Sequence, residues 1–252
     1  MSDGPGPIRL EPIPGLPEVE PGADLAGLIR EAAAAAGVAL AGRVVVVCQK
    51  VVSKAEGRLV RLEDVTPGDE AKAIAAEHDR DPRQVELVLR ESRRIVRRGH
   101  GVLITETHHG FVCANAGVDL SNAPGADVAV LLPEDPDASA RRLHAALSGP
   151  EGPVGVIVSD TFGRPWREGL VDVALGAAGL APIRDDRGSR DRAGRELLVT
   201  QPATADQLAA AAGLLMWKSA GIPVVVVSGL ALSGDGSVRD DLLRDPETDL
   251  FR

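Results

Sequence analysis

Short, almost purely apolar runs rich in Val and Ile recur along the chain, separated by polar segments. Runs of this kind, without polar alternation, are typical of strands buried on both faces of a sheet. Two further apolar runs flank a turn that holds His108 and His109, which we interpret as turn residues rather than metal ligands. Strands are expected at Val44–Val52, Leu59–Val65, Val128–Leu132, Val154–Val158 and Ile222–Val227, and a hairpin at Val102–Glu106 and Phe111–Ala114.

Helices are predicted where apolar residues follow a capping residue with helical spacing. Asp24, Asp81 and Asp135 are N-cap candidates, and the last two precede a Pro, which is favoured in the first turn. Arginines at 93, 94, 97 and 98 would offset the macrodipole of the third helix, with phosphate binding as the alternative. The expected helices are Leu25–Ala36, Gly68–His78, Arg83–Arg98, one from Asp135-Pro136 to Leu147, Leu170–Ala178 and Thr204–Ser219.

Strands and helices mix without strict alternation, which predicts a mixed α+β fold in a single domain over residues 1–252. Several prolines keep an N-terminal segment, about 1–22, extended, and the C-terminal tail, about 233–252, is polar. Arg184–Arg195 is crowded with Asp, Arg and Gly and is interpreted as either a substrate loop or a mobile loop. Every apolar run is shorter than the roughly 20 residues of a membrane span, so no membrane association is expected.

Composition narrows the range of partners. The 252-residue chain is 44% hydrophobic but only 2% aromatic, so base stacking on aromatic platforms is not expected. The net charge of -9 argues against nucleic acid or an anionic membrane as the main partner. Cys48 and Cys113 lie in apolar runs without a metal-binding pattern, so we interpret them as small buried thiols of a cytoplasmic protein.

The candidate chemistry is concentrated in two polar segments that follow apolar strands. The first is a tight loop that carries Asp119, and the second begins with Asp160 and Thr161. Carboxylates and a hydroxyl are ligands of hard cations such as Mg²⁺ or Mn²⁺, although an Asx-rich turn is the alternative for the first segment. Lys50 and Lys54 are cations available to a polyphosphate. Together these residues favour phosphoryl transfer.

Four segments together resemble the coenzyme F420-0:γ-glutamyl ligase family. They occur in that family's order and with similar spacing, from about Ile13 to the Leu250-Phe251 ending, so the resemblance covers nearly the whole chain. Each motif alone is weak, but four in order are specific. The segments are Lys50–Arg58, Gly110–Ala123, Asp160–Gly169 and the run that begins at Ile222-Pro223.

The resemblance implies a GTP-dependent ligase that joins L-glutamate to the lactyl carboxylate of coenzyme F420-0, or its dehydro form, and that often adds further γ-linked glutamates. A carboxylate does not condense with an amine at neutral pH without activation, which the γ-phosphate of GTP would supply as an acyl phosphate. The resemblance also implies Mn²⁺ or Mg²⁺, two ions being expected, help from K⁺, an unusual mixed-sheet α+β fold, and an intertwined homodimer.

The same resemblance assigns site residues. Asp119 and Asp160 match metal ligands, Asp160 is also expected to be essential for catalysis, and Thr161 matches a ligand of a second metal. Arg164 and Arg167 would clamp a phosphate or a substrate carboxylate, with surface ion pairs as the alternative. The expected nucleotide contacts are Leu16, Pro17, Glu18, Gln49, Lys50, Lys54, Asn122, Met216, Trp217 and Lys218.

Two positions depart from the family pattern. Gln49-Lys50 stands where some members have Ser-Thr, and Met216-Trp217-Lys218 aligns with a Met-Gly-Gln type segment. A protonated lysine cannot ligate a metal. Either Lys218 contacts phosphate directly, or the second metal is held differently.

Two other functions are considered beside the ligase. The first is another metal-dependent enzyme, such as a nucleotide phosphatase or a different carboxylate–amine ligase. It would be distinguished from the F420 ligase by whether GTP hydrolysis requires the deazaflavin and glutamate. The second is a non-catalytic module that binds nucleotide or F420. The change at Lys218 favours such a module, whereas the intact Asp119, Asp160 and Thr161 oppose it.

Overall fold

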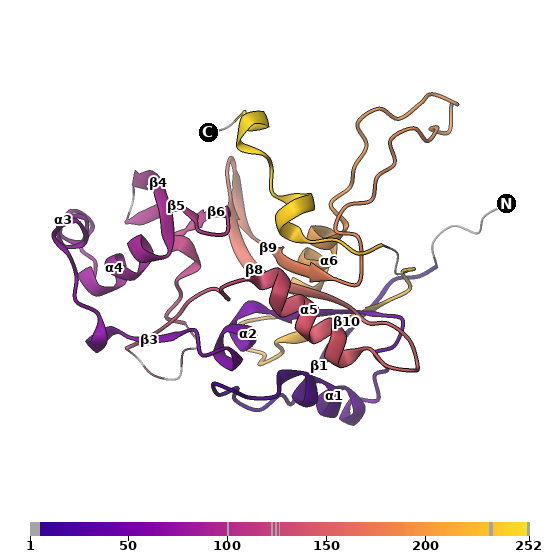
Figure 1. Cartoon of the computed structure of the whole chain (residues 1–252), viewed down its shortest axis with the longest axis horizontal. Helices are drawn as coiled ribbons and strands as arrows, with labels where there is room; N and C mark the ends of the chain where they lie inside the picture. Colours follow the sequence, from indigo (N-terminus) through magenta and orange to yellow (C-terminus); the bar gives the residue numbers. More distant parts are fainter. Residues whose placement is uncertain are drawn as a thin grey trace.

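A five-stranded mixed sheet forms the centre of the molecule (Figure 1). The computed structural model describes residues 6–99, 101–121, 123, 125, 127–231 and 234–250. In sheet order the strands are β1 (Arg9–Ile13), β10 (Val224–Ser228), β2 (Val44–Cys48), β8 (Gly155–Arg164) and β9 (Arg167–Ala178). Strands β2 and β8 run parallel, and the other neighbouring pairs are antiparallel. The mixed sheet confirms the expected α+β class.

Helices cover both faces of this sheet. They are α1 (Leu25–Ala35) and α5 (Pro136–Leu147) on one face and α6 (Thr204–Gly213) on the other. Successive residues of a strand point to opposite sides, so Val45 and Val47 of β2 pack with α1 and α5, whereas Val44 and Val46 pack with α6. All four valines are buried, as the unbroken apolar run predicts.

A smaller lobe lies beside the sheet, on the left in Figure 1. It contains the two-stranded pair β3 (Leu59–Arg61) and β7 (Val128–Val130), helices α3 (Asp69–His78) and α4 (Pro82–Arg90), and the three-stranded sheet of β4 (Ser92–Gly99), β5 (Val102–Thr107) and β6 (Val112–Ala114). Ile74, Val88 and Leu103 join α3, α4 and β5 in one apolar cluster. Within the described residues, no helix is both long and apolar enough to cross a membrane.

The strand predicted to reach Val52 ends at Cys48, and the chain continues as helix α2 (Gln49–Ala55). Strand β2 pairs with β8 only from Val44 to Cys48, so the backbone groups beyond it find their partners within a helix. This correction matters for the site, because Lys50 and Lys54 become i, i+4 neighbours on one helix face.

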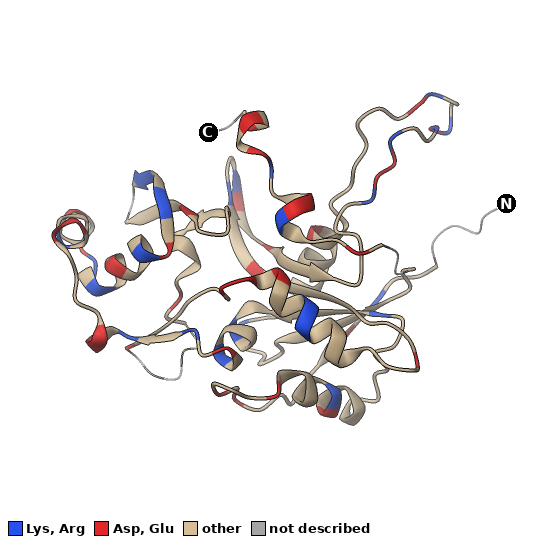
Figure 2. Cartoon of the chain, in the orientation of Figure 1, with Lys and Arg blue, Asp and Glu red and all other residues tan. Residues whose placement is uncertain are grey.

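The predicted helix Arg83–Arg98 ends at Arg90, and the residues after it form β4. The backbone groups of β4 are satisfied by antiparallel pairing with β5 across a short turn. The arginines therefore lie on a strand, and the interpretation that they offset a helix macrodipole is wrong. Arg94 lies 2.8 Å from Glu106 and Arg98 lies 3.4 Å from Glu70. Figure 2 shows this positive charge along β4.

The predicted helix Leu170–Ala178 is also a strand. Strand β8 continues to Arg164 through the segment predicted to be a loop, turns at Pro165 and Trp166, and returns as β9. The small residues of β9 reflect close packing rather than helix propensity. A Cβ atom at Gly176 would lie 2.1 Å from the carbonyl oxygen of Pro136, so only glycine lets α5 approach this closely.

Helix α6 ends at Gly213, six residues before the predicted end at Ser219. The residues between 181 and 203 form an extended arm (Figure 1), in which Arg184 pairs with Asp186 and Arg187 with Asp185. This arm includes the predicted segment Arg184–Arg195. The ion pairs within it connect neighbouring residues of the arm rather than distant parts of the fold.

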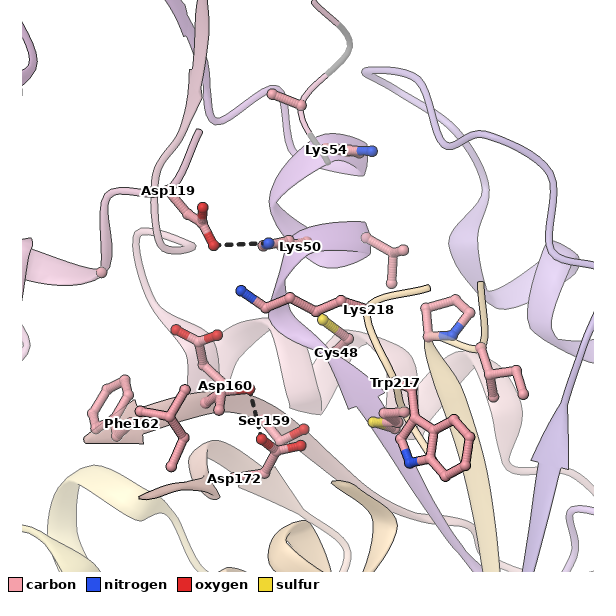
Figure 3. Close-up of a pocket in the computed structure, with 18 of the residues that line it drawn as sticks. Cys48, Lys50, Lys54, Asp119, Ser159, Asp160, Phe162, Asp172, Trp217 and Lys218 are labelled. Atoms are coloured by element: carbon pink, nitrogen blue, oxygen red, sulfur yellow. Dashed lines mark hydrogen bonds and ion pairs between the residues drawn. The ribbon is translucent and has the colours of Figure 1, made fainter. Parts of the chain in front are cut away.

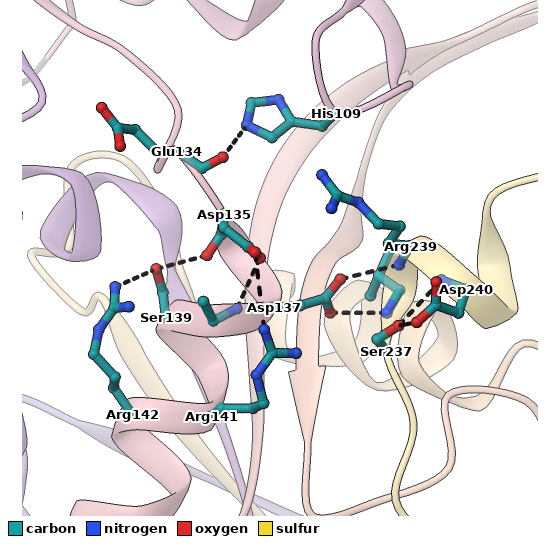
Figure 4. A network of polar contacts seen from close by, with 12 residues as sticks. His109, Glu134, Asp135, Asp137, Ser139, Arg141, Arg142, Ser237, Arg239 and Asp240 are labelled. Carbon is teal, nitrogen blue, oxygen red and sulfur yellow. Dashed lines mark hydrogen bonds and ion pairs between the residues drawn. The ribbon is translucent and has the colours of Figure 1, made fainter.

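Asp137 fastens the C-terminal segment to the sheet (Figure 4). Its carboxylate accepts hydrogen bonds from the backbone N–H groups of Ala177, Val238 and Arg239, at 2.8 to 3.0 Å. Nearby, the ring of His109 contacts the carbonyl oxygen of Pro133 at 2.9 Å. The Asp137 carboxylate and the His109 ring thus each bind backbone groups of other segments. His109 follows β5, which agrees with the expectation that it is a turn residue.

A candidate active-site cavity

A cavity of about 690 Å³ opens where the parallel strands β2 and β8 end. Ligands favour such carboxyl ends of strands, because the chain leaves the sheet there and its side chains converge. Helix α2 continues from β2 into the cavity wall, and β8 supplies residues 159–163. The rest of the wall comes from residues within 16–19, 113–123 and 216–223, and from Leu170 and Asp172 of β9. Figure 3 shows the polar side chains that these segments direct into the cavity.

Lys50 and Asp119 form an ion pair across the cavity, with 2.7 Å between Lys50 Nζ and Asp119 Oδ2. Lys50 Nζ also donates to Ser121 Oγ at 2.7 Å. Burial alone would raise the pKa of Asp119, but hydrogen bonds from Lys50 and from the Ser121 N–H outweigh it and hold this pKa below its usual range. The backbone of Asp119 pairs with Val130 of β7, which fixes the position of the carboxylate.

Lys54 lies one helical turn beyond Lys50 and contacts the carboxylate of Glu18 at 2.5 Å. The Lys54 side chain is buried, whereas that of Glu18 is 65% exposed, so the carboxylate forms the solvent side of the pair. Gln49 is fully buried and does not line the cavity. Its Oε1 accepts from Ser53 Oγ, and its Nε2 has no partner within the described residues.

Asp160 extends from β8 into the same cavity. Burial raises the pKa of Asp160 to about 7. The Thr161 N–H and the charge of Lys50 oppose this rise, while Asp119 and Asp172 add to it through repulsion between negative charges. Burial and the neighbouring carboxylates thus disfavour the charged form of Asp160, and a cation bound beside it would favour that form again.

Asp172 is a site residue that the sequence reasoning missed. It lies on β9 directly across from Thr161 on β8, and the Thr161 hydroxyl donates to Asp172 Oδ1 at 2.6 Å. The helix predicted over this part of the chain gives no reason to place Asp172 beside Thr161. A strand interpretation of 167–178 would have paired it with β8 and found it.

Met216, Trp217 and Lys218 line the cavity from the turn that follows α6. Figure 3 shows the Lys218 amine directed toward the space between the Lys50–Asp119 pair and Asp160. The Trp217 ring lies at the rim and is 67% exposed. Lys218 thus adds a third ammonium group to the cavity, beside those of Lys50 and Lys54.

The remaining sequence-predicted residues divide into three groups. Leu16 and Pro17 line the cavity beside Glu18. Arg164 and Arg167 do not line it; they flank the exposed turn of the β8–β9 hairpin, where Arg164 Nη2 donates to the Glu168 carbonyl at 2.7 Å. Asn122 lies outside the described residues. The structure therefore brings most of the expected nucleotide and metal residues to one cavity, but not the two arginines.

The donors in the cavity suit a hard cation. Asp119, Asp160 and Asp172 offer carboxylates, and Thr161 offers a hydroxyl, all of which are oxygen ligands. Within the described residues, no three acidic, His or Cys side chains converge closely enough to hold a metal by themselves. A cation would complete its shell with water or with oxygens of a ligand, as Mg²⁺ commonly does. The residues present fit such a partly open site.

Two thiols line the cavity but do not change this chemistry. Burial raises the pKa of Cys48 to about 11 and that of Cys113 to about 12, and the negative charge of Asp160 adds to both shifts. Both cysteines are therefore protonated at neutral pH. Hard cations also prefer oxygen to sulfur ligands, so the carboxylates and the hydroxyl remain the candidate metal ligands.

Comparison with known proteins agrees with the motifs. The family model for F420-0:Gamma-glutamyl ligase matches residues 15–229. The chain is 46% identical over 251 residues to the Coenzyme F420:L-glutamate ligase of Methanothermobacter thermautotrophicus, a match covering 97% of this chain and 99% of that protein. The protein of the same name from Methanopyrus kandleri is 47% identical over 252 residues, covering 97% and 98%. The chain therefore belongs to the F420-0:γ-glutamyl ligase family.

Proposed function

We propose that this protein joins L-glutamate to the lactyl carboxylate of coenzyme F420-0, or of its dehydro form, with GTP as the energy source. In this proposal GDP and phosphate are released, and further γ-linked glutamates extend the first. The observation that carries it is the match, over 97% of the chain, to proteins named Coenzyme F420:L-glutamate ligase. A cavity that combines several carboxylates with several lysines supports the same conclusion.

The reaction is proposed to occur in two steps. An oxygen of the acceptor carboxylate attacks the γ-phosphorus of GTP, the bond to the β-phosphate oxygen breaks, and GDP leaves an acyl phosphate behind. The amine of glutamate then attacks the acyl carbon, the carbon–oxygen bond to phosphate breaks, and phosphate departs while the amine loses its proton. In chemistry of this type the protein mainly positions groups and neutralises charge.

The lysines of the cavity are proposed to receive the phosphates. Lys50 and Lys54 already hold carboxylates, those of Asp119 and Glu18. Phosphate oxygens can replace these carboxylates as partners without leaving an ammonium group unpaired in a buried place. Lys218 would then contact phosphate directly. An exchange of this kind would also release Asp119 from Lys50.

A divalent cation, Mn²⁺ or Mg²⁺, would neutralise the phosphates and the departing GDP when bound. We assign Asp119 and Asp160 to the first ion and Thr161 to a second. Asp172 accepts the hydrogen bond of the Thr161 hydroxyl and so leaves the oxygen lone pairs of Thr161 for a ligand. Help from K⁺, a nucleotide contact of Asn122, and the clamp formed by Arg164 and Arg167 stay predictions.

We also propose that the protein works as a homodimer. The arm carries Leu198 and Val199, which are 72% and 86% exposed, and Trp166 at the hairpin turn is 79% exposed. The adjacent Leu198 and Val199 form a small exposed apolar surface on the arm, and a dimer contact would cover it. Light scattering at micromolar concentration measures the mass directly, and a monomer would contradict this part of the proposal.

The decisive experiment is mass spectrometry of F420-0 incubated with the protein, GTP, L-glutamate and Mn²⁺, with GDP followed in parallel. Glutamylated product together with GDP is expected, and the product ladder gives the number of glutamates added. GDP without glutamylated product would point to a different acceptor. Binding of the ligands without either product would support the non-catalytic module instead.

A further inference from the structure

The cavity wall contains a short left-handed turn. Asn115, Ala116 and Gly117 have φ angles of 52°, 53° and 71°. This conformation costs about 1–2 kcal/mol for an ordinary L-residue such as Ala116. It is held in place by packing, since Ala116 is buried and a Cβ atom on Gly117 would lie 2.7 Å from Leu132. Strain retained beside a cavity calls for a functional explanation.

The side chain of Asn115 is fixed by its oxygen atom. Oδ1 accepts from Arg80 Nη1 at 2.8 Å and, less closely, from the Leu103 N–H at 3.4 Å. Both partners can only donate, so the atom that faces them must be the oxygen rather than the nitrogen. The two N–H groups of Nδ2 remain. Within the described residues they have no protein partner, and Asn115 lines the cavity.

Arg80 makes this amide a stronger donor. The guanidinium is half-buried, its other contact is the Gly101 carbonyl at 3.5 Å, and no described carboxylate lies within ion-pair distance of it. A charged donor on Oδ1 polarises the amide and makes the Nδ2 hydrogens more positive, because hydrogen bonds in a chain strengthen one another. A polarised donor gains more from an anionic oxygen than from a neutral one.

We infer that Asn115 is an anion-binding residue of the cavity, and that Arg80 is the positioning residue behind it. Nδ2 of Asn115 donates to a carboxylate or phosphoryl oxygen of the bound substrate. The inference rests on the proposed function, which places two such anions in the cavity: the acceptor carboxylate and the nucleotide phosphates. The strained turn then serves to hold the amide between Arg80 and the substrate.

The test compares Asn115→Asp with Asn115→Gly. Asp keeps an oxygen that accepts from Arg80 and Leu103, but it removes both Nδ2 donors and adds negative charge. Gly adopts the left-handed turn without strain, adds no charge and also removes the donors. Calorimetry with GDP and Mn²⁺ in one arm, and with the F420-0 acceptor in the other, gives both affinities. Thermal unfolding of each variant shows whether it is folded.

Both variants are expected to lower the affinity for the same ligand by roughly 10- to 100-fold, the effect of losing a hydrogen bond to a charged group. The weakened ligand identifies the source of the anionic oxygen. If only Asn115→Asp weakens binding, the effect comes from its added charge, and the contact is excluded. Unchanged affinity for both ligands in folded Asn115→Gly likewise overturns the inference.

A second pair of variants tests Arg80 without touching the turn. Arg80→Met is expected to raise the KM or Kd of the same ligand by about 3- to 10-fold while kcat changes less. Arg83→Met is the matched control, because Arg83 pairs with Asp81 and does not line the cavity. Equal effects of the two variants would contradict a positioning role for Arg80.

The outcome separates this inference from the proposed function. A wild-type protein that binds the anions but forms no glutamylated product would disprove the ligase, while the Asn115 variants would still decide the binding role. Glutamylation that is unaffected in Asn115→Gly would leave the ligase and remove the inference. A wild-type protein that binds neither anion would overturn both.

Discussion

Thr161 and Asp172 face each other on neighbouring strands, and the Thr161 hydroxyl donates to Asp172 Oδ1 at 2.6 Å. The proton of the hydroxyl is thereby directed away from any ligand, and the lone pairs of Oγ1 remain available. Partners of this kind orient a ligand atom without touching the ion themselves. Asp172 thus gives the hydroxyl of the exposed Thr161 a defined orientation at the cavity.

Asp172→Ala is expected to raise the Mn²⁺ concentration for half-maximal activity by roughly 10- to 100-fold, the usual effect of losing an orienting partner. Asp172→Asn keeps an oxygen that accepts from Thr161 and should raise this Mn²⁺ concentration less. Thr161→Val should resemble Asp172→Ala, and the double variant should be no worse than either, since both act through one contact. A Mn²⁺ titration of activity checks all four proteins. Additive losses would show that the two residues act separately.

Asp160 is expected to make the metal-free protein less stable as the pH rises. Its pKa in the folded state, about 7, lies above the ordinary value of 3.8. Between these values the folded state binds more protons than the unfolded state, so stability falls with rising pH and the full cost is present above pH 7. Asp160→Asn should therefore stabilise the metal-free protein by about 2–4 kcal/mol at pH 8 and not at pH 3.5. Denaturant unfolding at both pH values measures the difference.

The same substitution is expected to abolish most activity. Losing one charge interaction with the transition state costs roughly 10²–10³-fold in rate. Mn²⁺ should raise the melting temperature of the wild-type protein, because a ligand that binds only the folded state stabilises it, and should raise that of Asp160→Asn much less. Activity within a few-fold of wild type, or an unchanged Mn²⁺ effect, would exclude Asp160 as a metal ligand.

Lys54→Ala is expected to raise the KM for GTP by about 10-fold or more, because a hydrogen bond to a charged phosphate is lost. Lys72→Ala, on an exposed face of α3 where Lys72 lies near Asp69, is the control and should leave KM unchanged. Initial rates over a GTP series give both values. A GTP titration that Lys54→Ala leaves unaltered would mean that the pair with Glu18 is only structural.

Gly176→Ala is expected to destabilise the fold strongly, by about 3 kcal/mol or more, because its Cβ atom would meet the backbone of Pro136 at 2.1 Å. Neither strand nor helix can shift without loss of packing. Gly149→Ala is the control, since a Cβ atom there has nothing within 4 Å, and should change stability by less than about 0.5 kcal/mol. Equal stabilities of the two variants would show that α5 and β9 separate easily.

Much of the fold could be predicted from the sequence where one local signal dominated. The valine run at 44–47 could only be a buried strand. Asp24 and Asp135 begin α1 and α5 as N-caps, each accepting from a backbone N–H of the first turn. Prediction failed where pairing partners decided the structure. Segments 92–99 and 167–178 contain residue types that helices tolerate. They are strands because antiparallel neighbours supply the hydrogen-bond partners of their backbone groups.

The candidate site shows the same division. Asp119, Asp160, Lys50 and Lys54 were recognised because each is polar at the end of an apolar run, and the structure brings all four to one cavity. Asp172 was missed because its importance comes from strand pairing with Thr161. The role inferred for Asn115 depends on contacts with Arg80, which is 35 residues away in sequence, and no local pattern reports such a contact.

The β8–β9 hairpin also limits how this protein can change in length. Inserting one residue between Thr161 and Asp172 would turn the following side chains to the opposite face of the sheet, and Asp172 would leave the cavity. Insertions in the arm at 181–203 would leave that pairing untouched. We therefore expect insertions in the strands of the hairpin to inactivate the protein by separating Thr161 from Asp172, and insertions in the arm to act only on contacts of the arm itself.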